Sequence, residues 1–257
     1  MQLVKNLFQY RELLKSNVKK EIRGKYKGSF LGVLWSFVNP LLQVLVYAIV
    51  FPYIMRVKTD NYLEYLIIGI IPWTFFTTVI NQGIITIRMN SGIIKKVYFP
   101  REILPISVAV SGLVNFLISC IIILLFCIFG GLGISAHLLL LPFVALIQFI
   151  FTLGLVFALC AINIYIKDTE YIVQFLINML FYATPILYPV TLFPEGIRWI
   201  LYLNPMTRII EFYRDIFMYH ITPELGSTLI LIVTSILVFF IGLLVFRKLE
   251  KGFAEEV

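Results

Sequence analysis

The stretch LPISVAVSGLVNFLISCIIILLFCIF, from Leu104 to Phe129, contains no charged residue and decides the fold class of this chain. A helix needs about 20 apolar residues to cross about 30 Å of hydrocarbon, and this stretch is longer than that. Its apolar residues form a continuous run instead of alternating with polar ones, which favours a helix over a strand of a membrane barrel. The stretch therefore predicts a helix that crosses a lipid bilayer.

Five further stretches have the same character, and the six together take up most of the 257 residues. Of all residues, 60% are hydrophobic and only 14% are charged, and the mean hydropathy is +0.96. This composition excludes a soluble enzyme and predicts an all-α integral membrane protein with six transmembrane helices. The predicted spans are Phe30 to Ile54, Tyr65 to Ile87, Leu104 to Phe129, Leu138 to Ile166, Tyr171 to Tyr188 and Leu229 to Phe246.

Basic residues fall mainly on one side of the six predicted spans. The segment before Phe30 is rich in lysine and arginine, and the second-to-third connection carries Arg88, Lys95, Lys96 and Arg101. By the positive-inside rule these segments face the cytoplasm, which places both termini inside the cell. The net charge of +7 is therefore assigned to topology and to attraction for membrane lipids, and nucleic acid is not expected as a partner.

The N-terminal segment has an apolar residue every three or four positions, which gathers these residues on one face of a helix. The row consists of Leu3, Leu7, Tyr10, Leu14, Val18 and Ile22. We predict an amphipathic interfacial helix that lies along the cytoplasmic headgroups, with neighbouring lysines meeting lipid phosphate. The alternative is a solvated basic leader that only supplies positive charge.

The second-to-third connection, residues 88–102, mixes basic with apolar and aromatic residues. The latter are Ile93, Ile94, Val97, Tyr98 and Phe99. An exposed cytoplasmic segment of that composition is typical of a docking surface for another protein. A chain reversal whose apolar residues rest on the membrane explains the same composition. The residues alone favour neither interpretation over the other.

Four prolines punctuate the outer stretch between Thr184 and His220. Between them lie two helix-length pieces, Glu195 to Leu203 and Met206 to Tyr219. We predict that both are short re-entrant helices that dip into the outer leaflet before the last span. Aromatic residues are frequent in this stretch. A belt at the lipid interface accounts for most of them, and stacking on sugar rings is the second interpretation.

The sequence offers no energy source of its own. Its Gly24-Lys25 pair is followed by Tyr26 and lacks the earlier glycine of a phosphate-binding loop. The spans contain no relay of Asp, Glu or His of the kind that a proton-coupled carrier needs. ATP and magnesium are therefore expected on a partner subunit, and no cofactor is expected in this chain. The cysteines lack metal-ligand spacing and predict no metal site.

Four motifs, in order along the chain, resemble one family. The first is Arg23-x-Lys25-Tyr26-x-x-Ser29-x-Leu31-Gly32-x-x-Trp35, followed by Pro40. The others are GIIPWTFF at 69–76, NIYIKD at 163–168, and TPILY at 184–188 with Asn204-Pro205. Together they are similar to the bacterial ABC transporter permeases that export polysaccharides, including O-antigen and teichoic acid. One departure is Lys167-Asp168, which stands where the family more often has Arg-Asp and weakens any claim of a bidentate contact.

The resemblance implies a single transmembrane permease domain over residues 1–257. Such permeases are multi-pass proteins of the bacterial cytoplasmic membrane that pair as homodimers and bind two copies of a nucleotide-binding ATPase. The substrate it implies is a lipid-linked glycan. The parts would be an interfacial helix and loop at 1–29, five spans at 30–188, an outer gate region at 189–225, a sixth span at 226–246 and a cytoplasmic tail at 247–257.

The resemblance also implies functional residues, none of them catalytic. Coupling to the ATPase is expected at Tyr26, Ser29, Leu31, Gly32, Lys95, Lys96, Tyr98, Arg101 and Glu102. The outer gate is expected at Pro194, Trp199, Tyr202 and Pro205. From position alone, the substrate path is predicted to include Trp73, Phe76, Tyr182 and Tyr188.

Three rival functions stay open. One is an ABC permease for drugs or simple lipids, and another is a non-transport scaffold for glycan biosynthesis. The third is a membrane enzyme acting on polyprenyl-linked sugars, which needs carboxylates or histidines gathered at one membrane face. The two histidines, His137 and His220, give no such set.

Overall fold

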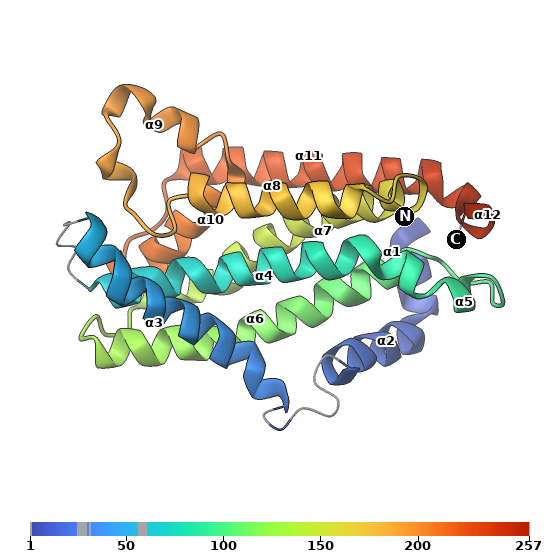
Figure 1. Cartoon of the computed structure of the whole chain (residues 1–257), viewed down its shortest axis with the longest axis horizontal. Coiled ribbons are helices and arrows are strands. Elements are labelled where there is room, and N and C mark those ends of the chain that lie inside the picture. The colour runs from blue at the N-terminus through green and yellow to red at the C-terminus, as the bar shows by residue number, and fades with distance from the viewer. Residues whose placement is uncertain (1, 25–29, 31, 56–60, 257) are drawn as a thin grey trace.

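The structure, a computed structural model, describes residues 2–24, 30, 32–55 and 61–256. Within these ranges the chain is helical and has no strand, and its long helices lie side by side in one bundle (Figure 1). The long helices are α4 (Tyr62–Met89), α6 (Ile103–Phe129), α7 (Leu141–Tyr165) and α11 (Leu225–Leu249). The predicted all-α class is confirmed.

Four helical segments of the described chain are long and apolar enough to cross a membrane. They are Tyr62–Met89, Ile103–Phe129, Ala136–Tyr165 and Leu225–Gly252. The third begins with the 3-10 turn η2 (Ala136–Leu140), which continues into α7. These segments match the second, third, fourth and sixth predicted spans to within a few residues at each end.

The first and fifth predicted spans differ from the structure. Helix α3 (Trp35–Met55) contains two prolines, and its apolar part is confined to Val38–Pro52. Helix α8 (Thr169–Ala183) stops well before the predicted end at Tyr188. It stops because the residue before a proline avoids the helical conformation, and Thr184 accordingly has an extended backbone. With 15 residues α8 is about 22 Å long, less than the hydrocarbon thickness of about 30 Å.

Helix α4 forms the centre of the bundle. It contacts α3, α6, α7, α8 and the short helix α10 (Pro205–Arg214). An unbroken run from Glu64 to Trp73 is buried. A helix that is apolar on all sides is expected to lie inside a bundle, and α4 has that character. Residues on α4 are therefore positioned by neighbours on every side.

Helices α7 and α11 pack against each other through glycines. A Cβ atom added at Gly154 would lie 2.5 Å from the Cα atom of Phe239, and one added at Gly242 would collide with the backbone of Gly154. Small residues allow helices in membranes to approach with their backbones in contact. The two glycines thus hold the last helix to the bundle.

The amphipathic N-terminal segment forms two helices instead of one. These are α1 (Gln2–Gln9) and α2 (Arg11–Gly24), and α2 lies along α6. Four residues of the predicted apolar row, Leu3, Leu7, Tyr10 and Leu14, are partly buried and pack against the core. The position of this segment at the membrane interface stays a prediction.

Two short helices precede α11, as predicted. They are α9 (Glu195–Leu201) and α10, and α9 projects from the bundle while α10 packs against α4, α7 and α11 (Figure 1). The second helix was predicted to reach Tyr219. Its α-helical part ends at Arg214, and the next five residues form the π-helical turn η4 (Asp215–Tyr219).

Candidate functional site

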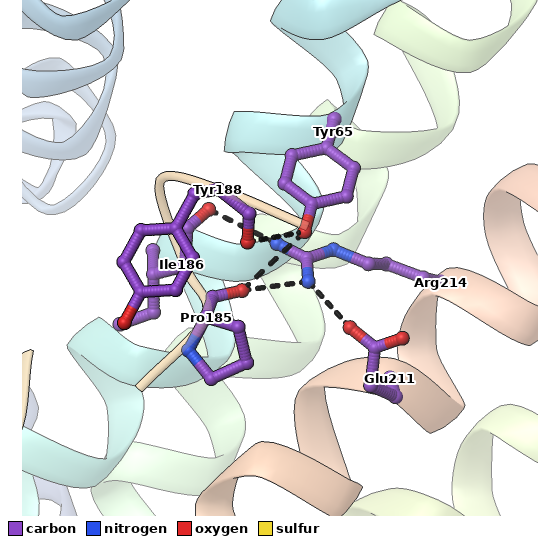
Figure 2. A network of polar contacts seen from close by, with 6 residues as sticks. All are labelled: Tyr65, Pro185, Ile186, Tyr188, Glu211 and Arg214. Atoms are coloured by element: carbon purple, nitrogen blue, oxygen red, sulfur yellow. Dashed lines mark hydrogen bonds and ion pairs between the residues drawn. The ribbon is translucent and has the colours of Figure 1, made fainter. Parts of the chain in front are cut away.

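A fully buried arginine ties together the segment between α8 and α11, which was predicted to lie on the outer side (Figure 2). Arg214, at the end of α10, donates through Nη1 to the carbonyl of Pro185 at 2.7 Å and to Oε1 of Glu211 at 2.6 Å. Its Nη2 donates to the carbonyl of Ile186 at 3.0 Å. A planar guanidinium has several N–H donors in a fixed fork, so one side chain satisfies all three acceptors. Arg214 therefore fastens the loop after α8 to α10.

Helix α4 supplies the other side of this network. The Cζ atom of Arg214 lies 3.4 Å from the ring centroid of Tyr65, in a cation–π contact. The Tyr65 hydroxyl donates to the carbonyl of Tyr188 at 2.9 Å, and the Tyr62 hydroxyl donates to that of Leu187 at 2.9 Å. The carbonyls of the four residues 185–188 are thus held by three side chains. We call Tyr62, Tyr65 and Arg214 the outer latch.

Space for the latch depends on a glycine of α4. A Cβ atom added at Gly69 would lie 3.0 Å from Nη2 of Arg214 and 3.4 Å from the carbonyl oxygen of Ile186. The first of these distances is tighter than nearly all contacts of real Cβ atoms, so the arginine would have to shift. The motif that begins at Gly69 therefore has a physical role beside the buried arginine.

The two ends of the outer segment are joined to each other. The Nδ2 of Asn204 donates to Oγ1 of Thr184 at 2.8 Å. The Oδ1 of the same asparagine accepts from the backbone N–H of Met206 at 3.0 Å and caps the start of α10. Two sequence motifs, Thr184-Pro185 and Asn204-Pro205, therefore meet in space. We call the bond between Thr184 and Asn204 the clasp.

The predicted gate residues lie around the latch without belonging to it. Pro194 immediately precedes α9, and Pro205 is the first residue of α10, where a missing N–H costs nothing. Trp199 is exposed on α9. Tyr202 is partly buried, and the Cζ atom of Arg208 lies 5.2 Å from its ring centroid. The prolines thus begin the short helices, while the aromatic side chains lie nearer the surface.

The predicted path residues are in two different environments. Trp73 and Phe76 are buried in the core, with ring centroids 5.4 Å apart, and Trp73 also packs against Phe181. Tyr182 is 64% exposed on α8, and its carbonyl accepts from the Tyr188 hydroxyl at 2.7 Å. In a single copy Trp73 and Phe76 act as packing residues. Their assignment to a path stays a prediction.

The C-terminal end of α4, predicted to face the cytoplasm, carries an exposed apolar patch. Helix α5 (Ser91–Ile94) and the turn after it are anchored by buried Ile94 and Phe99. Lys95 and Lys96 are exposed beside the patch. Exposed apolar groups next to charge are typical of interaction surfaces. The coupling patch, as we name it, consists of Met89, Ile93, Val97 and Tyr98, the last of which is 93% exposed.

The next two predicted coupling residues have partners within the chain. The Arg101 guanidinium donates to the carbonyl of Glu250, at the end of the last span. An Oε1 atom of Glu102 lies 3.7 Å from Nε of Arg247. These contacts join the loop after α5 to the last turn of α11 and to Glu250, which follows it.

The remaining predicted coupling residues precede α3. Tyr26, Ser29 and Leu31 lie outside the described residues. Gly32 has φ of +51°, a left-handed conformation that glycine adopts without steric cost. The predicted coupling role of Gly32 stays a prediction.

Sequence reasoning missed the latch arginine. In the sequence Arg214 is one of several outer arginines, and only its burial distinguishes it. The one local signal is Glu211, three residues earlier, at the spacing of a helical ion pair. That signal is common on exposed helices and does not identify a buried site.

Asp215 begins the turn that follows the latch and gives a pH-dependent prediction. Its partial burial, together with the nearby Glu211 carboxylate, raises the pKa of Asp215 to about 6. Because the folded chain holds this proton more tightly than the unfolded chain, stability is greatest below the unfolded pKa and falls as pH rises through about 6. Asp215→Asn is expected to raise the melting temperature by about 2 °C at pH 7.5 and not at pH 4.

The measurement is thermal unfolding of purified protein in nanodiscs at both pH values. Glu195→Gln, at an exposed carboxylate on α9, is the control and is expected to change neither melting temperature. An equal gain from Asp215→Asn at both pH values would contradict the assigned ionisation.

Four helices that are long and apolar enough to cross a bilayer define a multi-pass membrane protein. The family confirms this class, because the chain belongs to the ABC-2 type transporter family, whose model matches residues 12–218. It is 38% identical to the O-antigen export system permease protein RfbA of Myxococcus xanthus, over 100% of both chains.

Two further relatives are similar over nearly their whole length. RfbA of Klebsiella pneumoniae, also an O-antigen export system permease protein, is 36% identical over 97% of this chain and 96% of its own. The polysialic acid transport protein KpsM of Escherichia coli is 26% identical over 91% of this chain and 92% of its own. The family resemblance found in the sequence motifs is confirmed.

Proposed function

We propose that this chain is the membrane subunit of an ATP-driven exporter that moves a lipid-linked polysaccharide across the bacterial cytoplasmic membrane. The observation that carries the proposal is the full-length similarity to relatives named as an O-antigen export permease and a polysialic acid transport protein. These two names describe different glycans. The similarity therefore supports the class of cargo and leaves the particular glycan open.

The energy for export is proposed to come from a partner. Membership in an ABC transporter family supports a separate cytoplasmic ATPase, and the sequence has no phosphate-binding loop of its own. We propose that two ATPase copies bind ATP and magnesium and act on this chain from the cytoplasmic side. Both termini of the chain would then lie on that side, with six helices crossing the membrane.

We further propose that two copies of the chain pair through α3 and α8. Tyr47 of α3 packs against Phe181 of α8, with ring centroids 5.8 Å apart, so the two helices meet on one side of α4. Helix α8 keeps an exposed apolar face that includes Phe175 and Tyr182. A helix that is short for the bilayer gains from a protein neighbour. The glycan path would then run between the copies.

The coupling patch is proposed as the docking site for the ATPase. Buried interface hot spots contribute about 2 kcal/mol or more, and aromatic residues are frequent among them. The double variant Val97→Ala with Tyr98→Ala is therefore expected to lower transport-coupled ATP hydrolysis by about tenfold or more. The measurement is the ATPase rate of the purified complex in nanodiscs.

The matched control is Phe129→Ala. Phe129 is 85% exposed and is the last residue of α6, at the end of the bundle opposite to the coupling patch. It is expected to leave ATP hydrolysis unchanged. Equal loss in both variants, or full activity in the double variant, would remove the patch from the docking site and favour a chain reversal that rests on the membrane.

Export itself is tested in vesicles that contain this chain, its ATPase and lipid-linked glycan extracted from the same cells. ATP is expected to make the glycan accessible to a lectin on the far side. ATP hydrolysis without glycan movement would refute the proposal. Movement of drugs or simple lipids instead would establish the rival permease function, and failure to bind any ATPase would favour a scaffold.

A further inference from the structure

A pocket lined by both apolar and polar side chains lies between α3, α4 and α6. Its volume is about 140 Å³ and it is partly open. Asn39 lies on the α3 wall, Thr74 and Thr78 on α4, and Asn115 and Ser119 on α6. We call it the midplane pocket. None of its lining residues belongs to the outer latch or to the coupling patch.

The pocket lies deep in the membrane-length part of the fold. Thr74 and Thr78 are near the middle of α4, which has 28 residues, and Asn115 and Ser119 are near the middle of α6, which has 27. Each helix is about 40 Å long at a rise of 1.5 Å per residue. Polar groups at their centres therefore lie near the middle of a bilayer that these helices cross.

One of these polar atoms is buried without a partner. The Oδ1 atom of Asn115 accepts no hydrogen bond in the described chain. Thr74 and Thr78 are partly exposed and line the same pocket. An unpaired polar group in an apolar environment costs about 1–3 kcal/mol. The pocket is therefore stabilised by a polar occupant.

The lining also indicates the chemistry of that occupant. None of its residues is ionisable, so an anionic or cationic group would meet no opposite charge. Amides and hydroxyls offer both donors and acceptors to a neutral hydroxyl. The rings of Trp35, Phe75 and Phe116 also face the pocket and can cover the C–H surface of a sugar.

We propose that the midplane pocket binds a neutral, hydroxyl-bearing group, and that in the exporter this group is a sugar unit of the glycan. The identity of the sugar as cargo rests on the proposed function, whereas the polar occupancy rests on the pocket alone. A cavity of about 150 Å³ holds one benzene molecule, so the pocket takes part of a pyranose ring and leaves the rest outside. Hydroxyls of that ring would then satisfy Thr74, Thr78 and Asn115.

Occupancy is tested first by cysteine accessibility. Thr78→Cys is treated with methanethiosulfonate ethylsulfonate in membranes that carry the full complex. The native cysteines are buried, which keeps the background low. Because only a hydrated thiolate reacts, Cys at position 78 is expected to react at least about tenfold faster than the control Leu117→Cys. Leu117 lies at the same depth on α6 and is 43% exposed on its outside. Equal rates would overturn the proposal.

The ligand is tested by comparing membranes from cells that make the glycan with membranes from cells in which its first sugar transfer is disabled. If glycan occupies about two-thirds of the pockets, only about one-third of the thiols can react. Modification at position 78 is therefore expected to be about threefold slower in the membranes that contain glycan. Equal rates in both membranes would mean a pocket filled by water or lipid only. That result would overturn the sugar assignment.

A matched pair of variants connects the pocket to export. Thr78→Val is expected to slow glycan export by about threefold to tenfold, because valine cannot make the hydrogen bond that the threonine hydroxyl makes with the sugar. Thr77→Val should leave the rate unchanged, because the Thr77 hydroxyl donates to the carbonyl of Thr74 and lies outside the pocket. Equal rates in these two variants, with normal export by the unaltered chain, would overturn this inference alone. Unchanged glycan display after deletion of the chain would instead overturn the proposed function.

Discussion

Replacing Arg214 with methionine is expected to lower the melting temperature of the purified protein by about 10 °C and to abolish glycan export. Methionine fills similar space but leaves the Pro185 and Ile186 carbonyls and the Glu211 carboxylate without their donor. Breaking a buried ion pair by removing one partner costs about 3–5 kcal/mol. For a chain of this size each kcal/mol shifts the midpoint by about 2–4 °C. Thermal unfolding in nanodiscs measures the change.

The control for this prediction is a double-mutant cycle. Glu211→Gln is expected to destabilise the unaltered chain and to add little once Arg214 is methionine, because the ion pair is already lost. Arg214→Lys retains the charge but lacks the planar guanidinium, so it should lower the melting temperature by less than Arg214→Met does. Additive effects of the two single changes, or a methionine variant that unfolds like the unaltered chain, would show that the latch does not hold the outer segment.

Replacing Gly242 with leucine is expected to have the second large effect, a loss of more than about 3 kcal/mol of stability. A side chain at this position would collide with the backbone of Gly154 and push α11 away from α7. Contact between backbones through small residues is a main source of helix association in membranes. The expected result is a poorly folded protein with low yield, measured by gel filtration and thermal unfolding.

Gly226→Leu is the matched control on the same helix. A Cβ atom at Gly226 would meet only Oε1 of Glu224, at an ordinary distance of 3.8 Å. Leucine also favours the helical conformation more than glycine does, so this variant should be neutral or slightly stabilising. Equal destabilisation by both leucines would mean that the helix tolerates no large residue anywhere, and the close approach of α7 and α11 would not be the cause.

The sequence predicted the spans that consist of uninterrupted apolar residues. Residues 104–129 lie on one helix, α6, whose only proline, Pro105, falls in the first turn. The clearest error is in the fifth span, where Pro185 ends α8 early. Other prolines lie within α3 and α4 without ending them. Hydropathy averages over such positions, whereas the backbone responds to each proline individually.

The parts of the candidate site that lie within one short stretch of sequence could be predicted from its composition. The coupling patch follows from apolar residues beside Lys95 and Lys96 in one short connection, and the short outer helices follow from their prolines. The latch was not predictable, because it joins α10 to a loop and to the start of α4. The hydrogen bond from Tyr213 to Gln148, at 2.9 Å, was not predicted for the same reason, because the two residues are far apart in the sequence. Only the tertiary structure brings such residues together.

The clasp has an evolutionary consequence. Thr184 and Asn204 meet directly, so the chain between them leaves the bundle and returns to the same point. Exposed connections with closely spaced ends accept insertions and deletions with little effect on the remaining fold. Changes in the length of residues 191–203 are therefore expected to leave the packed helices in place.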